Sequence, residues 1–303
     1  MDFKNIEPAD YPTILPYFRH QPYDLCEFSL ATLTVWANEE YHPQTAVDNG
    51  TLYIKGTFVK RRDLDHLMLP LSANEDFPPE RLKDLALELG MHAFWFIPDC
   101  YLARYGEKRI SEQFSIEEQT AYADYVYRRE DLVQLKGNRY AKKRNLISQF
   151  LKSHPSDHLQ FEAISGRNAG LCLEFLKEWC STRNCNEDLE DSLTCERLAA
   201  EKMLTNIDIF DSKGLLLKIK GRICAFGICS YLNDSMGILQ FEKAFENIKG
   251  LYQFFDRECV KRLFSEYEYV NKESDMEVPG LAKSKKSYHP IKRVRSYQLK
   301  LKI

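Results

Sequence analysis

The sequence predicts a mixed α/β protein, of the α+β kind, built from two similar halves. Its 303 residues exceed the usual size of one domain and favour two domains of roughly 150 residues each. Hydrophobic residues make up 44% of the chain, beside 13 Gly and 12 Pro, which is typical of a folded globular protein. The expected order helix, helix, hairpin, strand, helix, strand occurs twice, which indicates a duplicated α/β unit with a mostly antiparallel sheet.

The first copy is expected within residues 8–97. Leu30, Leu33 and Trp36 recur at helical spacing and predict a helix. The Asn49-Gly50 step predicts a tight hairpin turn. The expected elements are helices over 8–18, 26–36 and 80–89, strands over 52–54 and 57–59 beside the turn, and strands over 66–71 and 93–97.

The second copy is expected within residues 159–270. Its hairpin should turn at Lys220-Gly221, between strands over 215–219 and 223–231. The other expected elements are strands over 159–163, 236–241 and 267–270, and helices over 169–182, 193–204 and 251–265.

A basic helix is expected between the two copies, over 138–152, with Asn138 as its N-cap and Pro155 beyond its end. The domain boundary is placed just after this helix. An N-terminal domain is therefore expected over 1–157, and a C-terminal domain that holds the probable active site over 158–303.

Lys and Arg are concentrated in two stretches without acidic residues, 132–156 and 278–303. These hold 14 of the 42 basic residues, so the remainder carries 28 basic against 45 acidic side chains, although the formal net charge is only -3. Such segregation indicates a polyanionic ligand such as tRNA or anionic lipid. The alternative is that both stretches are solvated surfaces.

Several functional classes lack their sequence signals. The N-terminus has no apolar run of a secretory signal and no stretch approaches a membrane span, so a cytoplasmic protein without a transmembrane segment is expected. The nine Cys include no C-x-x-C pair, and Cys180, Cys185 and Cys195 fit no common zinc pattern, so no metal site is expected. Motifs of nucleotide-binding loops, zinc proteases and serine hydrolases are absent as well.

Four ordered motifs carry a family resemblance. The segments are Tyr127 to Phe150, Phe241-Glu-Lys-Ala244, Gly250-Leu-Tyr-Gln253 and Val270 to Pro290, the last with Asn-x-Glu-x-Asp, Gly-Leu and paired lysines. Together they resemble a bacterial family related to the C-terminal catalytic domain of phosphatidylglycerol lysyltransferases. The resemblance spans nearly the whole chain.

The resemblance implies two tandem N-acetyltransferase-like (GNAT-like) domains, as also in Fem-type peptidoglycan aminoacyltransferases. Relatives of known activity move an aminoacyl group from charged tRNA to a lipid or peptide acceptor. The implied activity is therefore an acyl- or aminoacyltransferase that uses aminoacyl-tRNA and has no tightly bound cofactor. Two alternatives stay open: transfer from acyl-CoA to a small amine, and non-catalytic binding of tRNA or anionic lipid.

The expected catalytic residues are Glu242, Glu273 and Asp275. Glu242 should follow the strand over 236–241 directly and act as a general base or hold a donor amine, unless it forms a salt bridge with Lys243 or another surface cation. Glu273 and Asp275 follow Asn271 at i+2 and i+4, so an extended segment would present all three on one face. We expect the three carboxylates to converge on one pocket in the second half.

The expected donor-binding residues lie mainly in the two basic stretches and at the start of the helix over 251–265. Tyr140 and Tyr288 are candidates for base stacking, with core packing as the alternative. Tyr252 stands where acetyltransferases have a small residue, which disfavours coenzyme A. The donor-binding set is Lys136, Arg139, Lys143, Arg144, Asn145, Lys249, Gly250, Tyr252, Asn271, Lys283 and Lys286.

Overall fold

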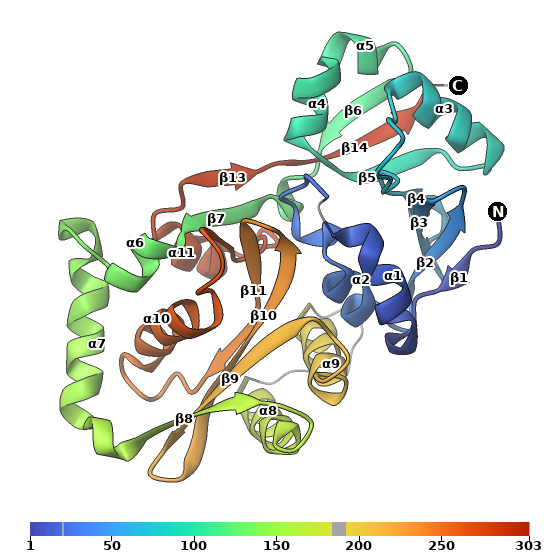
Figure 1. The fold of residues 1–303 in the computed structure, drawn as a ribbon. Helices are drawn as coiled ribbons and strands as arrows, with labels where there is room; N and C mark the ends of the chain where they lie inside the picture. Colours follow the sequence, from blue (N-terminus) through green and yellow to red (C-terminus); the bar gives the residue numbers. More distant parts are fainter. Residues whose placement is uncertain (20, 184–191, 303) are drawn as a thin grey trace.

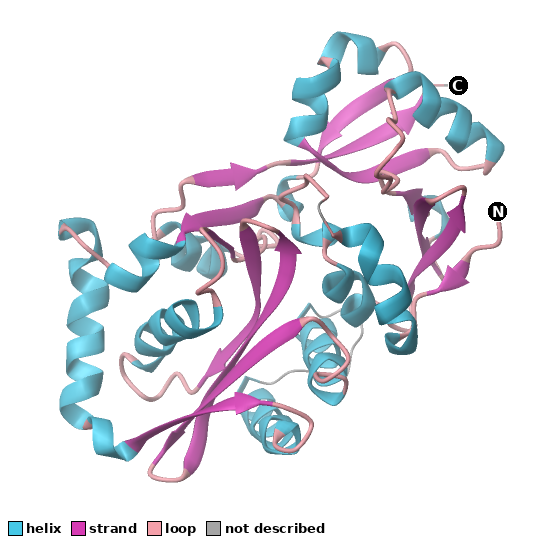
Figure 2. Cartoon of the chain, viewed as in Figure 1, coloured by secondary structure: helices cyan, strands magenta, loops and turns pink. Residues whose placement is uncertain are grey.

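The computed structural model describes residues 1–19, 21–183 and 192–302. In this part of the chain the strands form two seven-stranded sheets (Figure 1). Each sheet contains both parallel and antiparallel pairs, and helices flank both (Figure 2). The expected mixed α/β class is therefore confirmed.

The first sheet has the strand order β1-β2-β3-β4-β5-β14-β6. Asn49 and Gly50 have φ of 48° and 77°, so the tight turn predicted from the Asn-Gly step is confirmed. Only His66–Leu67 of the expected strand over 66–71 lies in the sheet. Its strands are β1 (Lys4–Asn5), β2 (Tyr41–Asp48), β3 (Thr51–Phe58), β4 (His66–Leu67), β5 (Ala93–Pro98), β6 (Phe114–Glu118) and β14 (Ser296–Leu301).

The second sheet has the strand order β13-β7-β12-β11-β10-β9-β8. The predicted hairpin is confirmed, because β9 and β10 pair around Lys220 and Gly221, which have φ of 50° and 83°. Its strands are β7 (Asp124–Arg128), β8 (Leu159–Ile164), β9 (Ser212–Ile219), β10 (Arg222–Asn233), β11 (Met236–Ala244), β12 (Tyr269–Asn271) and β13 (Lys292–Val294).

Helices cover both faces of the second sheet. Phe226 packs against Phe175 of α8, whereas the neighbouring Gly227 faces Cys259 of α10, so α8 and α10 lie on opposite faces. Helices α1 and α2 lie between the two sheets (Figure 1). The helices are α1 (Tyr11–Phe18), α2 (Leu30–Trp36), α3 (Pro79–Glu88), α4 (Asp99–Tyr105), α5 (Glu107–Ser111), α6 (Arg129–Gln134), α7 (Ala141–Ser153), α8 (Ala169–Arg183), α9 (Ser192–Thr205), α10 (Leu251–Leu263) and α11 (Pro279–Lys286).

The expected helices are present, with corrected ends. Asn138 lies in a 3-10 turn before α7, and the N-cap of α7 is Tyr140, so the predicted cap is one turn too early. None of the helices in the described residues is long and apolar enough to cross a membrane.

The two sheets do not divide the chain near residue 157, where the boundary was expected. Strand β7 precedes that point but pairs with β12 and β13 in the second sheet. Strand β14 ends the chain but pairs with β5 and β6 in the first sheet. Strand pairing is decided by partners far apart in sequence, which a local pattern does not show. Each sheet therefore contains a strand from the other half.

Helix α7 packs against the start of α10. Gly250, the N-cap of α10, has φ of 80°, and a Cβ placed there would lie 2.2 Å from the carbonyl oxygen of Leu146. Phe150 stacks on Phe254 with ring centroids 4.7 Å apart. Gly250 is required here for both its backbone conformation and the close approach of α7.

We predict that Gly250→Ala lowers the free energy of unfolding by about 2–4 kcal/mol, from left-handed backbone strain and overpacking together. Gly221→Ala is the matched control, because Gly221 has φ of 83° but open space around its Cβ position. The control should lose only the strain, about 1–2 kcal/mol. Chemical denaturation measures both. Equal losses would show that α7 does not press on Gly250.

Candidate functional site

The second sheet opens between β11 and β12. Strand β12 pairs with β11 only from Met236 to Ile238, whereas β11 continues to Ala244 along β10. A register shift near Leu239 marks a bulge, which bends a strand. The expectation that β11 and the strand ending at Asn271 are neighbours is confirmed. Glu242 lies inside β11, opposite Gly227, and not after the strand as expected.

Glu242 lies beside a buried ion pair on the α10 side of the sheet. Lys272 pairs with Asp256 of α10, and their side chains are 9% and 5% exposed. Oε1 of Glu242 is buried without a hydrogen-bond partner. Burial, followed by the negative charge of Asp256, raises the pKa of Glu242 to about 8, although nearby lysines oppose the shift. Glu242 is thus a carboxyl group tuned towards neutral pH.

The ring of Tyr288 lies close to two of these lysines. Lys143 Nζ lies 3.7 Å and Lys272 Nζ 4.7 Å from its centroid, within the range of cation–π interactions. Tyr140 donates a hydrogen bond to the backbone oxygen of Tyr288 at 3.0 Å. Both tyrosine side chains are buried, so core packing, and not an exposed stacking surface, is what the structure shows.

Lys243 points to the opposite face of the sheet from its neighbour Glu242. Its Nζ lies 2.5 Å from Glu196 of α9 and 4.5 Å from the ring centroid of Trp179. The alternative that Glu242 forms a salt bridge with Lys243 is therefore wrong, because Lys243 pairs across the other face.

Glu273 is the second partly buried carboxyl group at the opening. Its φ is 55°, and its Oε1 is buried without a hydrogen-bond partner. Burial raises its pKa to about 8, although Lys285 opposes the shift. Asn271 is fully buried: it accepts a hydrogen bond from the amide of Glu273 at 2.6 Å and donates one to Asp124 at 2.7 Å. Asn271 therefore positions Glu273.

Asp275 has a different environment. It accepts a hydrogen bond from Tyr125 at 2.5 Å and another from the amide of Glu277 at 3.0 Å. Burial acts to raise its pKa, but these two hydrogen bonds and the positive charges of Arg293 and Lys285 together lower it. The expectation that Asn271, Glu273 and Asp275 lie on one face of an extended segment is wrong. The left-handed conformation at Glu273 breaks the alternation of side chains between the two faces. We assign Asp275 a structural role.

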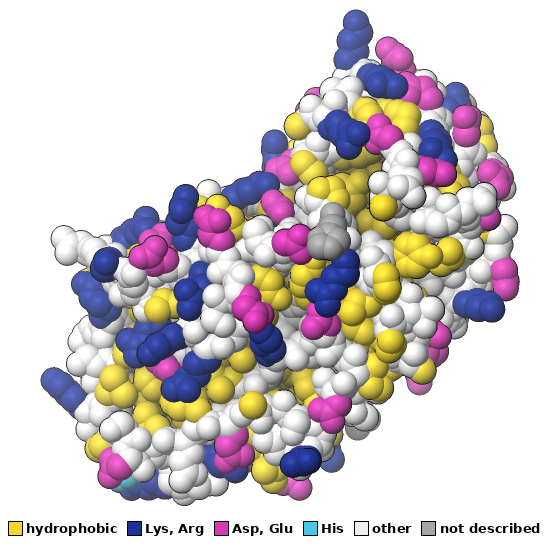
Figure 3. Space-filling model, viewed as in Figure 1, with side chains coloured by type: hydrophobic (Ala, Val, Ile, Leu, Met, Phe, Trp, Pro, Cys, Tyr) yellow, Lys and Arg dark blue, Asp and Glu magenta, His cyan; other side chains and the backbone are white. Residues whose placement is uncertain are grey.

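The two basic stretches meet in space. Besides the Tyr140–Tyr288 hydrogen bond, Nε2 of His289 lies 3.3 Å from the backbone oxygen of Arg139. Figure 3 shows Lys and Arg side chains gathered on the surface over α7 and α11, with acidic side chains among them. Of the expected donor-binding residues, the exposed ones are Lys136, Arg139, Arg144, Asn145, Lys249, Lys283 and Lys286.

Some of these residues already hold local structure. Arg144 donates to the backbone oxygens of Leu135 and Gly137 and so braces the loop before α7. Arg139 pairs with Asp131 at 3.2 Å. At the start of α10, Gly250 is buried beneath α7 and Tyr252 is half-buried, so of that turn only Lys249 is exposed among the expected residues.

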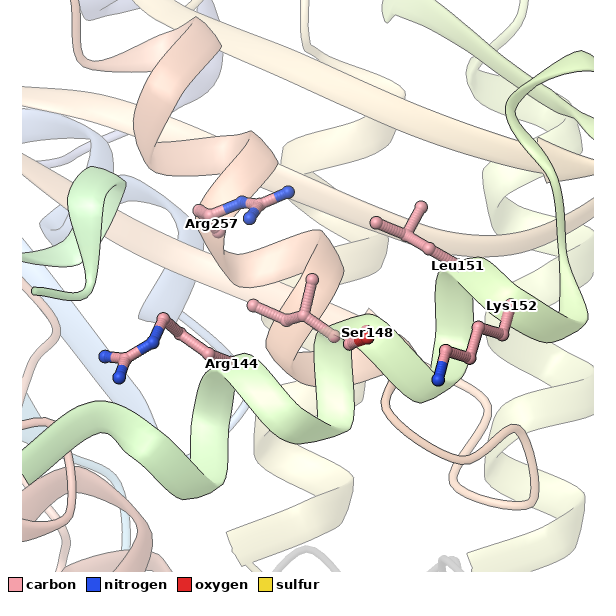
Figure 4. Close-up of a pocket in the computed structure, with 6 residues that line it drawn as sticks. Arg144, Ser148, Leu151, Lys152 and Arg257 are labelled. Carbon is pink, nitrogen blue, oxygen red and sulfur yellow. The ribbon is translucent and has the colours of Figure 1, made fainter. Parts of the chain in front are cut away.

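A groove of about 410 Å³ lies between α7 and α10. Figure 4 shows that Arg144, Ser148, Leu151 and Lys152 come from α7 and Arg257 from α10. None of the candidate carboxylates lines this groove. We expected the principal pocket to lie in the second half alone. This groove does not fit that expectation, since most of its lining comes from α7. Its lining suits an anionic group with an apolar part.

The partners of the candidate carboxylates were not expected from the sequence. Lys272 lies inside the Asn-x-Glu motif, and Lys285 is one of the lysines of the same motif, so both could have been proposed from the sequence. Nζ of Lys285 donates to the backbone oxygens of Lys272, Glu273 and Ser274 at 2.5 to 3.2 Å. Asp256 gave only a weak signal: a charge within the apolar stretch of a helix.

The sequence and the structure are both similar to those of known proteins. Residues 21–300 match the family described as phosphatidylglycerol lysyltransferase, C-terminal. A crystal structure of a conserved protein of unknown function from Bacteroides thetaiotaomicron aligns over 100% of both chains, with 30% identity and a TM-score of 0.88. No curated protein matches the sequence.

Two structures with lower sequence identity also align with this chain. The C-terminal domain of an Agrobacterium fabrum protein described as a putative lysylphosphatidylglycerol synthetase aligns over 86% of this chain and 84% of that one, with 15% identity and a TM-score of 0.58. A tandem GNAT protein from the clavulanic acid biosynthesis pathway aligns over 99% and 98%, with 9% identity and a TM-score of 0.44.

We predict that Glu242→Gln stabilises the protein relative to wild type increasingly as pH rises. A carboxyl whose folded pKa is raised to about 8 favours folding below its unfolded pKa, and this contribution is lost as pH rises through 8. Between pH 5 and 8 the variant should gain on the order of 1–3 kcal/mol. Denaturant unfolding across this range measures it, with the exposed Glu88→Gln as control. A difference independent of pH would mean that Glu242 is charged throughout.

Proposed function

Because this chain belongs to the family of phosphatidylglycerol lysyltransferase C-terminal domains, as its four motifs indicate, we propose that it is an aminoacyltransferase. The donor is aminoacyl-tRNA, and the acceptor is an amine or hydroxyl group of a lipid, peptide or small molecule. One observation carries the proposal: two partly buried carboxyl groups, each with a buried oxygen lacking a hydrogen-bond partner and a pKa of about 8, flank the place where β11 and β12 separate. Glu242 lies on the α10 side of the sheet, and Glu273 lies near Lys243 and Glu196 on the other side.

The chemistry needs a proton acceptor and no covalent enzyme intermediate. Glu242 or Glu273 takes a proton from the acceptor amine or hydroxyl, whose lone pair attacks the ester carbonyl carbon of the donor. The bond to the ribose oxygen breaks, and the protonated carboxyl group returns its proton to that oxygen. A base with a pKa near the working pH suits this step.

The edge of β11 beyond Leu239 is the expected place for the acyl carbonyl, because β12 does not cover it. Lys272 and Lys143 lie close to Glu242 and supply positive charge where the oxyanion develops. Asn271 and the loop that carries Glu273 set the position of the second carboxyl group.

The cationic surface over α7 and α11 provides the contact with the tRNA backbone. Acyl-CoA is the competing donor, but burial of Gly250 and the half-buried Tyr252 leave the first turn of α10 ill suited to its phosphates. Aminoacyl-tRNA as donor implies a cytoplasmic location. Anionic lipid is a further candidate ligand for the same basic surface.

We predict that the wild-type protein transfers label from mixed aminoacyl-tRNA to an acceptor in cell extract, and that Glu242→Gln and Glu273→Gln each reduce transfer at least about a hundredfold. Loss of general-base assistance is the reason. Both variants should remain folded, because neither oxygen without a partner contributes a hydrogen bond that the change removes.

The exposed Glu88→Gln is the control and should keep full transfer. A parallel reaction with labelled acetyl-CoA separates the two donors. Transfer from acetyl-CoA alone would replace the aminoacyl proposal, and full transfer by folded Glu242→Gln and Glu273→Gln proteins would remove both carboxylates from the mechanism.

We predict that tRNA binds through the basic surface and that Lys136→Glu combined with Lys286→Glu weakens binding in a salt-dependent way. For each phosphate that the variant no longer neutralises, the slope of log Kd against log salt should fall by about one. Both side chains are exposed on the described surface and brace no neighbouring segment, whereas Lys143 and Arg144 pack against the structure.

The matched control is Lys60→Glu combined with Lys108→Glu, which makes the same change in net charge beside the first sheet. Fluorescence anisotropy at several salt concentrations compares the pairs. If both double variants change the slope equally, tRNA responds only to net charge and the surface over α7 and α11 is not its site.

A further inference from the structure

A second cluster of buried groups lies where the 3-10 turn at Cys26–Phe28, just before α2, meets β7 and β12. Among the described residues, one ligand atom each of Cys26, Glu27 and Asp124 lies within 4.8 Å of the other two, and all three residues are buried. Glu27 is only 9% exposed, and its Oε2 has no hydrogen-bond partner. A buried carboxylate oxygen without a partner is costly unless a ligand or proton satisfies it.

The charges in this cluster do not balance. The nearby cation is Lys285, but its three hydrogens are directed at three backbone oxygens. As metal ligands, the Cys26 thiolate and the carboxylates of Glu27 and Asp124 carry three negative charges, which Lys285 and one divalent cation together neutralise.

The spacing of one pair of donor atoms suits a tetrahedral ion. Sγ of Cys26 lies 3.5 Å from Oδ1 of Asp124. Zinc bonds of about 2.3 Å to sulfur and about 2.0 Å to oxygen, at a tetrahedral angle, place two ligand atoms about 3.5 Å apart. The separation required of a zinc-ligating pair is therefore already present.

Hydrogen bonds from neighbouring residues orient the carboxylate of Asp124, as is usual for metal ligands. Oδ2 of Asp124 accepts hydrogen bonds from the amide of Cys26 and from Asn271, both at 2.7 Å, which leaves Oδ1 directed at the cluster. Such contacts fix the orientation of a ligating carboxylate. A thiolate beside carboxylates favours zinc or a similar transition metal over magnesium or calcium, which prefer oxygen donors alone.

We propose that Cys26, Glu27 and Asp124 bind a divalent transition metal, with zinc as the ion that the donor set fits best. This site was not expected from the sequence, because its ligands are not the closely spaced cysteines of common zinc motifs. Of the three cysteines weighed there, Cys185 lies outside the described residues. The metal would join the 3-10 turn at Cys26–Phe28 to the start of β7 and stand near Glu273.

The test uses the full chain, stripped of metal and titrated with zinc chloride by calorimetry and with cobalt chloride by absorbance. We expect one ion per chain and a cobalt–thiolate charge-transfer band. Cys26→Ser should remove the band, and Glu27→Gln should weaken binding at least about tenfold. Glu27→Gln is the safer variant for folding, because Gln keeps the size of Glu27 and the Oε2 atom has no hydrogen bond to lose.

Cys172→Ser, at a buried thiol of α8, is the control and should retain both the stoichiometry and the band. Absence of binding, or binding unchanged in folded Cys26→Ser and Glu27→Gln proteins, would overturn the proposal. Binding of an alkylammonium ion such as butylammonium in place of metal would also overturn it and would assign the carboxylates to an organic cation. Neither donor nor acceptor is present, so the outcome is independent of transferase activity.

Discussion

The buried ion pair between Lys272 and Asp256 is the interaction on which the candidate site depends. It connects the segment after β12 to helix α10 at the point where the second sheet opens. Removing one member of a buried pair leaves an uncompensated charge and costs about 3–5 kcal/mol. The pair also holds Lys272 against Tyr288 and places the negative charge of Asp256 near Glu242. Burial is the main cause of the raised pKa of Glu242, and the attachment of α10 adds to it by placing Asp256 nearby.

The exchange of strands between the sheets places the other parts of the site. Strand β7 enters the second sheet and pairs with β12, which brings Asp124 to Asn271. The chain returns through α11 and β13 before β14 joins the first sheet, and this path lays the C-terminal basic stretch against α7. Charged residues that are far apart in sequence therefore share one surface next to the opening.

Local structure was largely predictable, because turn chemistry and apolar spacing act over a few residues. The Asn49-Gly50 turn and the helix from Leu251 are examples. The sheets to which β7 and β14 belong were not predictable, because each strand pairs with strands that are distant in sequence. Glu242 and Glu273 could be proposed from the motifs, but Asp275 was misplaced, since nothing in the sequence shows that Glu273 takes a left-handed conformation. Lys272, Asp256 and Lys285, the charged partners of these carboxyl groups, were missed because burial of a charge depends on tertiary packing.

The central claim is that the reaction takes place where β11 separates from β12. A crystal structure with a non-hydrolysable 3′-aminoacylamino-adenosine tests it most directly. We expect the amide carbonyl to lie along the edge of β11 between Leu239 and Ala244, and the reacting nitrogen to lie near Glu242 or Glu273, within about 3.2 Å for a direct hydrogen bond. An analogue bound only in the groove between α7 and α10, with the opening empty, would contradict it.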